Sequence, residues 1–239
     1  KRTNESSKTE AMHIPRPNQQ STADDTKDIM INNEHFFGYC TEFKYLGTTF
    51  TPELNDSNYV QLRIDQASKA LYAMNKNIFR QKEISSKLRL RSYNAIIVNL
   101  LLGGGGESWA LNEEDRRHIK VFHHQSLRRM LNITIYNVMK QHITNKEVRV
   151  KMKSYSMEQT MELRRARWLE KISHMGSDRG PRKILVAWTT NERPRGRPQQ
   201  TIRHGLASTL TDHLKLPSPK MNDWIKLASN HKEWGEHVE

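Results

Sequence analysis

The sequence is poor in cysteine, in long apolar runs and in negative charge. Cys40 is the one cysteine among 239 residues, which excludes an internal disulfide and a zinc site made of several cysteines. The longest apolar stretch, Ala95–Leu102, is interrupted by Asn99 and falls well short of the roughly 20 residues that a membrane-spanning helix needs. Apolar side chains make up only 35% of the chain and the mean hydropathy is −0.84, so we expect a small or divided core and no membrane partner.

Acidic side chains are outnumbered by basic ones, 26 to 39, which gives a formal net charge of +13. A chain this basic typically binds a polyanion, nucleic acid first and an anionic membrane surface second. The excess lies downstream, because residues 1–60 hold six Lys and Arg against nine Asp and Glu.

Most of the chain has the apolar spacing of helices. A stripe that recurs every three or four residues predicts a helix starting near Asn55, Asp56 or Ser57. Its members are Val60, Ile64, Ala67, Leu71, Met74 and Ile78. A second helix is expected after Ser85 or Ser86, with the apolar residues Leu88, Tyr93, Ile96, Ile97, Leu100 and Leu101.

A third helix is predicted where Asn112 precedes three acidic residues, since a cap and first-turn anions both favour a helix start. Further helices are expected over 145–153, 158–175 and 199–214. Near the N-terminus, short β-prone runs on either side of Asn32-Asn33 predict a hairpin. We therefore expect a mainly α fold with a small N-terminal β-hairpin.

Four glycines, Gly103–Gly106, raise the question of a phosphate-binding loop. Such a loop follows a strand and is usually followed by Lys and Ser or Thr. Here helix-type residues precede the glycines, and the next helix opens with carboxylates that repel phosphate. The glycines are predicted to end one helix and turn the chain into the next.

Several motifs occur in a fixed order, and together they resemble the C-terminal part of a non-LTR (LINE-type) retrotransposon reverse transcriptase. Lys8, Thr9 and Met12 match a palm-ending "KT-x-x-M", and Tyr45, Leu46 and Gly47 match a "YLG" strand. Glu107 and Trp109 match the helix junction "L-L-Y-G-x-E-x-W". Phe122, Leu127, Arg128 and Leu131 match the thumb helix "F-x-x-x-x-L-R-x-x-L". Arg165, Arg167, Trp168, Gly196, Arg197 and Pro198 match the "R-x-R-W" and "G-R-P" patterns of the linker.

The resemblance implies three regions. Residues 1–54 would be the end of the palm, residues 55–135 a helical thumb that grips the minor groove of the template–primer duplex, and residues 136–239 a basic helical linker that helps to hold element RNA and target DNA. The sequence departs from the family at three places: Gly103 or Gly104 replaces an aromatic residue, Glu170-Lys171 replaces Gly-His, and Ile202 replaces a tryptophan.

Reverse transcriptases use paired aspartates to hold two metal ions. Asp24 and Asp25 follow the "KT-x-x-M" motif and lie in a polar segment, so we interpret them as loop acids and expect the polymerase carboxylates to precede Lys1. His123 and His124 lack the i, i+4 spacing of metal ligands on one helix face, and with His118 they are interpreted as surface or packing residues. No catalytic residue, metal site or cofactor is predicted.

The candidate binding surface is the segment 161–203. It contains eleven Lys and Arg and four Asp and Glu, which gives a local net charge of +7. The residues expected to contact nucleic acid are Arg164, Arg165, Arg167, Lys171, Arg193, Arg195, Arg197 and Arg203. Trp168 and Trp188 lie among them and could stack on bases. The position of Trp168 beside Leu169 and Ile172 favours core packing instead.

The leading hypothesis is therefore a nucleic-acid-binding thumb and linker without its own polymerase site, whose partner is an RNA–DNA hybrid or duplex DNA. The missing N-terminal polymerase region would be a second partner, and the expected location is intracellular and nuclear. Two alternatives stay open: an element-derived helical protein that binds DNA or other proteins, and a decayed retroelement product that folds only in part.

Overall fold

The computed structural model describes residues 10–14, 29–30, 36–45, 48–52, 56–109, 111–186, 206–207, 209–213, 215–216 and 221–238. The chain is mainly helical, with short strands near the N-terminus, which confirms the predicted fold class. It forms two compact units, and the second begins at Val60. The described residues on both sides of the expected boundary at 135/136 belong to this second unit.

The first unit contains the strands. β3 (Phe36–Tyr39) pairs with β1 (Glu10–Ala11) in parallel and with β2 (Ile29–Met30) in antiparallel orientation. The second pairing confirms the antiparallel arrangement predicted on either side of Asn32-Asn33. β4 (Phe43–Tyr45) and β5 (Thr48–Phe50) form a separate antiparallel pair. Aromatic and β-branched residues dominate these segments, as is usual in strands.

Helix α1 (Ser57–Met74) buries the predicted stripe: Val60, Ala67 and Leu71 are at most 3% exposed. The helix then continues as a π-helix, η1 (Asn75–Phe79), in which Phe79 is fully buried and Ile78 only partly. Because a π-helix has more residues per turn than an α-helix, the buried position moves one residue along. Ile78, the last member of the predicted stripe, is therefore only partly buried.

The second predicted helix consists of three consecutive segments, α2 (Ser86–Ser92), the π-helix η2 (Tyr93–Val98) and α3 (Asn99–Leu102). The Ser85 side chain caps its start by accepting a hydrogen bond from the Leu88 amide. Tyr93, Ile97 and Leu101 are fully buried. Leu88 and Ile96, which are also among the apolar residues of this predicted helix, are 51% and 40% exposed.

The glycines do end this helix, as predicted. The Gly103 amide donates to the Asn99 carbonyl, 2.8 Å away, and the backbone then turns through Gly104 and Gly105 at φ values of 79° and 92°. Only glycine adopts such angles without strain. The turn leads to Trp109, which is 5% exposed.

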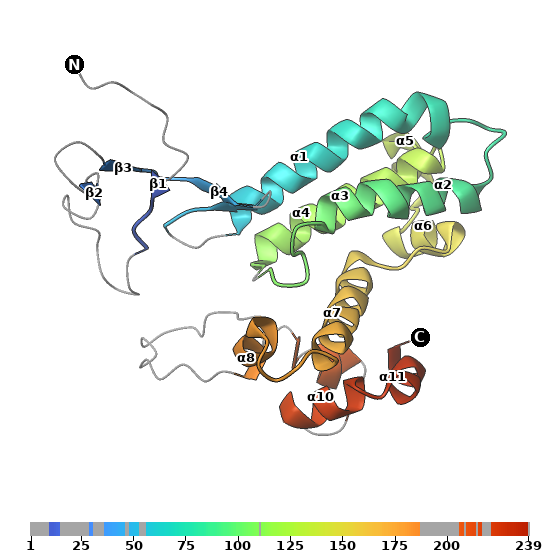
Figure 1. The fold of residues 1–239 in the computed structure, drawn as a ribbon. Helices are drawn as coiled ribbons and strands as arrows, with labels where there is room; N and C mark the ends of the chain where they lie inside the picture. The colour runs from blue at the N-terminus through green and yellow to red at the C-terminus, as the bar shows by residue number, and fades with distance from the viewer. Residues whose placement is uncertain are drawn as a thin grey trace, which may run out of the picture. The chain divides into compact units, whose positions relative to one another are not determined.

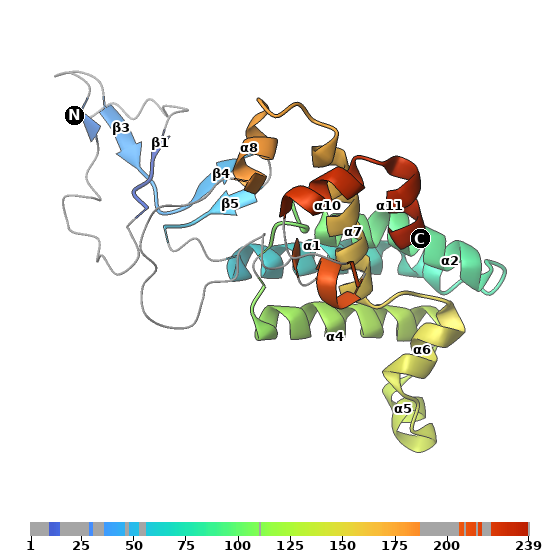
Figure 2. The same cartoon turned by 90° about the horizontal axis from the view of Figure 1, so that it is seen from below.

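Helix α4 (Glu113–Met130) begins as predicted, with the Asn112 side chain accepting a hydrogen bond of 2.8 Å from the Asp115 amide. Two short helices follow, α5 (Ile135–Gln141) and α6 (Asn145–Met152), each opened by a capping box. Helix α5 is not among the predicted elements. Figure 2 shows α5 and α6 following one another beyond the end of α4, and α6 contacts both α4 and α2.

Helix α7 (Met157–Ser173) lies at the centre of the C-terminal half of the second unit (Figure 1). It contacts α4, α8 (Gly180–Val186), the π-helix η3 (Thr209–His213), α10 (Met221–Ala228) and α11 (His231–Val238). A core cluster joins α7, α8, η3, α10 and α11 and includes Leu169, Ile172, Leu210, Trp224 and Trp234. Within the described residues, none of the helices is long and apolar enough to span a membrane.

Candidate nucleic-acid interface

The expected nucleic-acid contacts that the structure describes, Arg164, Arg165, Arg167 and Lys171, are carried by α7. This helix is fixed at its start by Ser156, which caps the Gln159 amide while the Gln159 side chain bonds back to the Ser156 amide. At its end, the Arg182 guanidinium donates to the carbonyls of Ile172 and Ser173, 3.2 and 2.7 Å away. Both ends are thus tied down, so the outer face of α7 is held in a defined position.

Arg167 and Lys171 form an exposed cationic edge on α7. They are four residues apart and therefore lie on one face of the helix. Neither makes a hydrogen bond or an ion pair within the part of the chain that the structure describes. Their charged groups are available to phosphates, which a protein commonly contacts through Lys and Arg.

Arg164 lies beside this edge but is already engaged. Its guanidinium donates to the Asn99 side-chain oxygen on α3. Partial burial lowers the pKa of Arg164, and the nearby Glu107 carboxylate opposes that effect. Arg164 thus joins α7 to α3.

Arg165 does not belong to the exposed edge. It is 7% exposed, and its guanidinium donates to the backbone carbonyls of Glu107 and Trp109, 3.2 and 3.5 Å away. Burial is the main cause that lowers the pKa of Arg165, followed by the proximity of Arg116. Because the guanidinium is directed into the protein, we remove Arg165 from the set of expected phosphate contacts.

Trp168 is only partly buried and packs against the core cluster of α7, α10 and α11, in agreement with the favoured interpretation. The remaining candidates, Arg193, Arg195, Arg197, Arg203 and Trp188, lie outside the described residues. Asp24 and Asp25 also lie outside them.

His123 is a packing residue, as predicted, and is 2% exposed. Its Nε2 lies 3.1 Å from the Tyr155 carbonyl, which can only accept, so Nε2 carries the hydrogen. Nδ1 then accepts from the Tyr93 hydroxyl, 3.0 Å away. Burial lowers the pKa of His123 to about 4. The neutral ring therefore holds α4 against η2 and the segment before α7.

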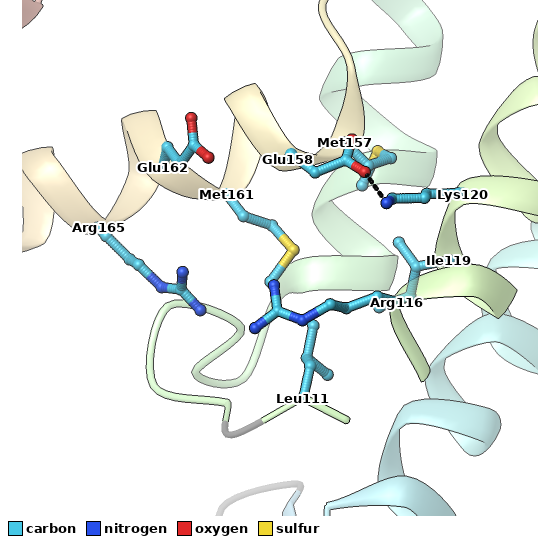
Figure 3. A pocket seen from close by; sticks show the side chains of 9 residues that line it. All are labelled: Leu111, Arg116, Ile119, Lys120, Met157, Glu158, Met161, Glu162 and Arg165. Atoms are coloured by element: carbon cyan, nitrogen blue, oxygen red, sulfur yellow. Dashed lines mark ion pairs between the residues drawn. The ribbon is translucent and has the colours of Figure 1, made fainter. Parts of the chain in front are cut away.

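A small pocket lies between α4 and α7 (Figure 3). Its volume of about 40 Å³ admits a few water molecules but no nucleotide. At its rim Lys120 and Glu158 form an ion pair of 2.6 Å. The side chains of Arg116 and Arg165 extend into the space between the two helices (Figure 3), so the pocket belongs to the α4–α7 contact. Among the described residues, no group of three His, Cys, Asp or Glu is placed to hold a metal ion.

Local sequence patterns did not reveal two of these roles. The fork geometry of Arg165 and the helix-ending contact of Arg182 both depend on backbone carbonyls from other segments. Helical periodicity puts Arg165 and Arg167 on different faces of one helix. It does not indicate which of these faces the neighbouring elements cover.

Comparison of the chain with protein-family models, curated proteins and solved structures finds no match.

Proposed function

We propose that this chain is the thumb and post-thumb linker of a non-LTR retrotransposon reverse transcriptase, and that it binds RNA–DNA hybrid or duplex DNA without a polymerase site of its own. The observation that carries the proposal is the contact of Arg165 with Glu107 and Trp109. Arg165 comes from the "R-x-R-W" motif and its two partners from the helix-junction motif. Two motifs that were matched to the family separately thus meet in space.

Three further motif residues are buried among the helices, which supports the proposal. Phe122 and Leu127 are buried on α4, and Trp109 is buried where the glycine turn ends. These residues contribute to the packing of the helices, as is expected of residues that specify a fold. The exposed Arg167 and Lys171 supply the adjoining phosphate contacts.

Binding is tested by titrating the purified chain onto a labelled RNA–DNA hybrid and a DNA duplex over a series of salt concentrations. We expect log affinity to fall linearly with log salt concentration, with a slope of roughly 0.7–0.9 for each phosphate contact. The affinity should depend little on base sequence. No binding at low salt, or an affinity that salt does not change, would contradict the proposal.

The lack of polymerase activity is tested by primer extension with magnesium or manganese. We expect no RNA-templated synthesis, because the sequence favours Asp24 and Asp25 as loop acids and not as a pair of metal ligands. Activity that copurifies with the chain and disappears in the Asp24→Ala, Asp25→Ala double variant would show that this pair is catalytic and that the assignment of a polymerase-free fragment is wrong.

A further inference from the structure

A second group of cations lies outside α7, at the end of α4 and on α5 and α6. Residues 128–153 hold seven Lys and Arg against one Glu, a local net charge of +6. The cations are Arg128, Arg129, Lys140, Lys146, Arg149, Lys151 and Lys153. This segment is shorter than 161–203 and nearly as strongly charged.

Most of these cations are not neutralised by the protein. Glu147, the one acid of the segment, accepts hydrogen bonds from the amide and hydroxyl of Thr144, 2.7 and 3.0 Å away, and so serves to cap α6. Arg128 donates to Asn145 and Arg149 to His124, and both are half-buried. The other five cations are exposed, and none of them forms an ion pair within the described ranges.

Helix α5 presents apolar side chains to solvent beside these charges. It buries no residue, and Ile135, Tyr136 and Met139 are 71%, 64% and 71% exposed. The helix is nevertheless well defined, because Thr134 and Asn137 form a capping box at its start. The Lys140 ammonium lies 5.7 Å from the centre of the Tyr136 ring, so an aromatic face and a cation stand together.

We propose that α5 and α6 form a binding surface for single-stranded nucleic acid, in which the exposed cations contact phosphates and the Tyr136 ring stacks on a base. Aromatic rings interleaved with cations are the usual composition of single-strand binding surfaces, because every unpaired base offers a π-face. A duplex presents such faces only at its ends. The surface therefore binds a different form of nucleic acid from the one assigned to α7.

The same surface is a poor fit for a membrane. Binding to a lipid interface grows with the apolar area that is buried. Helix α5 has seven residues, and the polar Asn137 and Gln141 interrupt its apolar side chains. Four exposed apolar side chains, with Val150 of α6 included, give little insertion, whereas the five exposed cations suit a phosphate backbone.

The role of the ring is tested with Tyr136→Ala and Tyr136→Phe, using a fluorescein-labelled oligothymidylate as the probe. Tyr136→Ala should weaken binding roughly 5- to 150-fold, and Tyr136→Phe should keep it, because phenylalanine retains the stacking face. Tyr72→Ala is the matched control, since Tyr72 on α1 is 77% exposed. Circular dichroism confirms that each variant is folded. An unchanged affinity of folded Tyr136→Ala would overturn the proposal.

The role of the charges is tested with a Lys140→Gln, Lys146→Gln, Lys151→Gln triple variant. The slope of log affinity against log salt for oligothymidylate should flatten by about 2. A triple variant that loses binding to phosphatidylserine vesicles but keeps oligothymidylate binding would assign the surface to membranes and overturn the proposal.

The α5–α6 surface does not depend on the family assignment. A variant of α7 separates single-strand binding by this surface from hybrid binding by α7. An Arg167→Ala, Lys171→Ala variant should lose affinity for the RNA–DNA hybrid and keep its affinity for oligothymidylate. Loss of oligothymidylate binding in this variant alone, with the α5–α6 variants unaffected, would place the single-strand contact on α7 and contradict the inference.

Discussion

Arg165 and Arg167 carry the same charge two positions apart, yet the protein uses them in opposite ways. The Arg165 guanidinium bonds to the carbonyls of Glu107 and Trp109, whereas Arg167 extends into solvent. A lysine could not replace Arg165 well, because it lacks the planar fork that reaches two carbonyls at once. The first residue holds the fold, and the second is available to a ligand.

Replacing Arg165 by Met should lower the free energy of unfolding by about 2–4 kcal/mol, because one buried and one partly buried carbonyl lose a charged donor. The matched Arg167→Met variant should change stability by no more than about 0.5 kcal/mol, as is usual for exposed residues. Urea unfolding followed by circular dichroism measures both. Equal, small changes would mean that the Arg165 contacts do not hold α7 to the glycine turn.

His123 should make stability depend on pH. The pKa of the folded residue is about 4 against an ordinary value of 6.5, so the unfolded chain takes up the proton first as the pH falls. The contribution of neutral His123 to the free energy of unfolding is complete above pH 6.5. It falls by about 3 kcal/mol as the pH is lowered towards 4. His124, whose pKa burial also lowers, contributes in the same direction.

The check is urea unfolding of the wild type and His123→Gln at several pH values from neutral to about 4.5, the range that the linkage defines. The variant should be less stable at neutral pH but lose less stability on acidification. Carboxylates titrate alike in both proteins, so the difference between the two curves isolates His123. Parallel curves would show that the imidazole is not held neutral.

At the scale of the helical element, the apolar spacing predicts burial well along most of α1 and less well in the helices that contain a π-helical segment. The predicted burial of the apolar stripe on α1 is correct up to Leu71, since a period of 3.6 residues places Val60, Ala67 and Leu71 on one face. Phe79 replaces Ile78 in the core because η1 has a wider turn. No local residue pattern announced that turn, nor the exposure of Leu88 and Ile96 around η2.

Leu71→Ala should cost roughly 2–5 kcal/mol, because the side chain is 3% exposed and its loss leaves a cavity. Lys69→Ala, on an exposed position of the same helix, should stay within about 0.5 kcal/mol. Thermal or urea unfolding of the pair provides the comparison. If both variants lost little stability, α1 would not pack through its apolar stripe.

At the scale of the whole molecule, helix starts were predictable because their signals are local. Asn112 and Ser85 both cap the helices that they were expected to start. The candidate binding surface was less predictable, because a local charge count cannot tell a guanidinium that bonds to a neighbouring segment from one in solvent. Arg164 and Arg165 illustrate this limit, and Arg167 and Lys171 remain as the exposed cations of the expected set within the described residues.

The most direct test of the account is the salt dependence of hybrid binding by a quadruple variant, Arg167→Ala, Lys171→Ala, Arg195→Ala and Arg197→Ala. These positions avoid the Arg164 and Arg165 contacts, so the fold should survive, which circular dichroism verifies. A Lys226→Ala, Lys232→Ala variant, altered at exposed positions of α10 and α11, is the control.

The account predicts that the slope of log affinity against log salt for the RNA–DNA hybrid flattens by roughly 3 in the quadruple variant, with similar losses on unrelated sequences, and stays unchanged in the control. A folded quadruple variant with the slope of the wild type would contradict the claim that α7 and the basic segment after it bind the phosphate backbone.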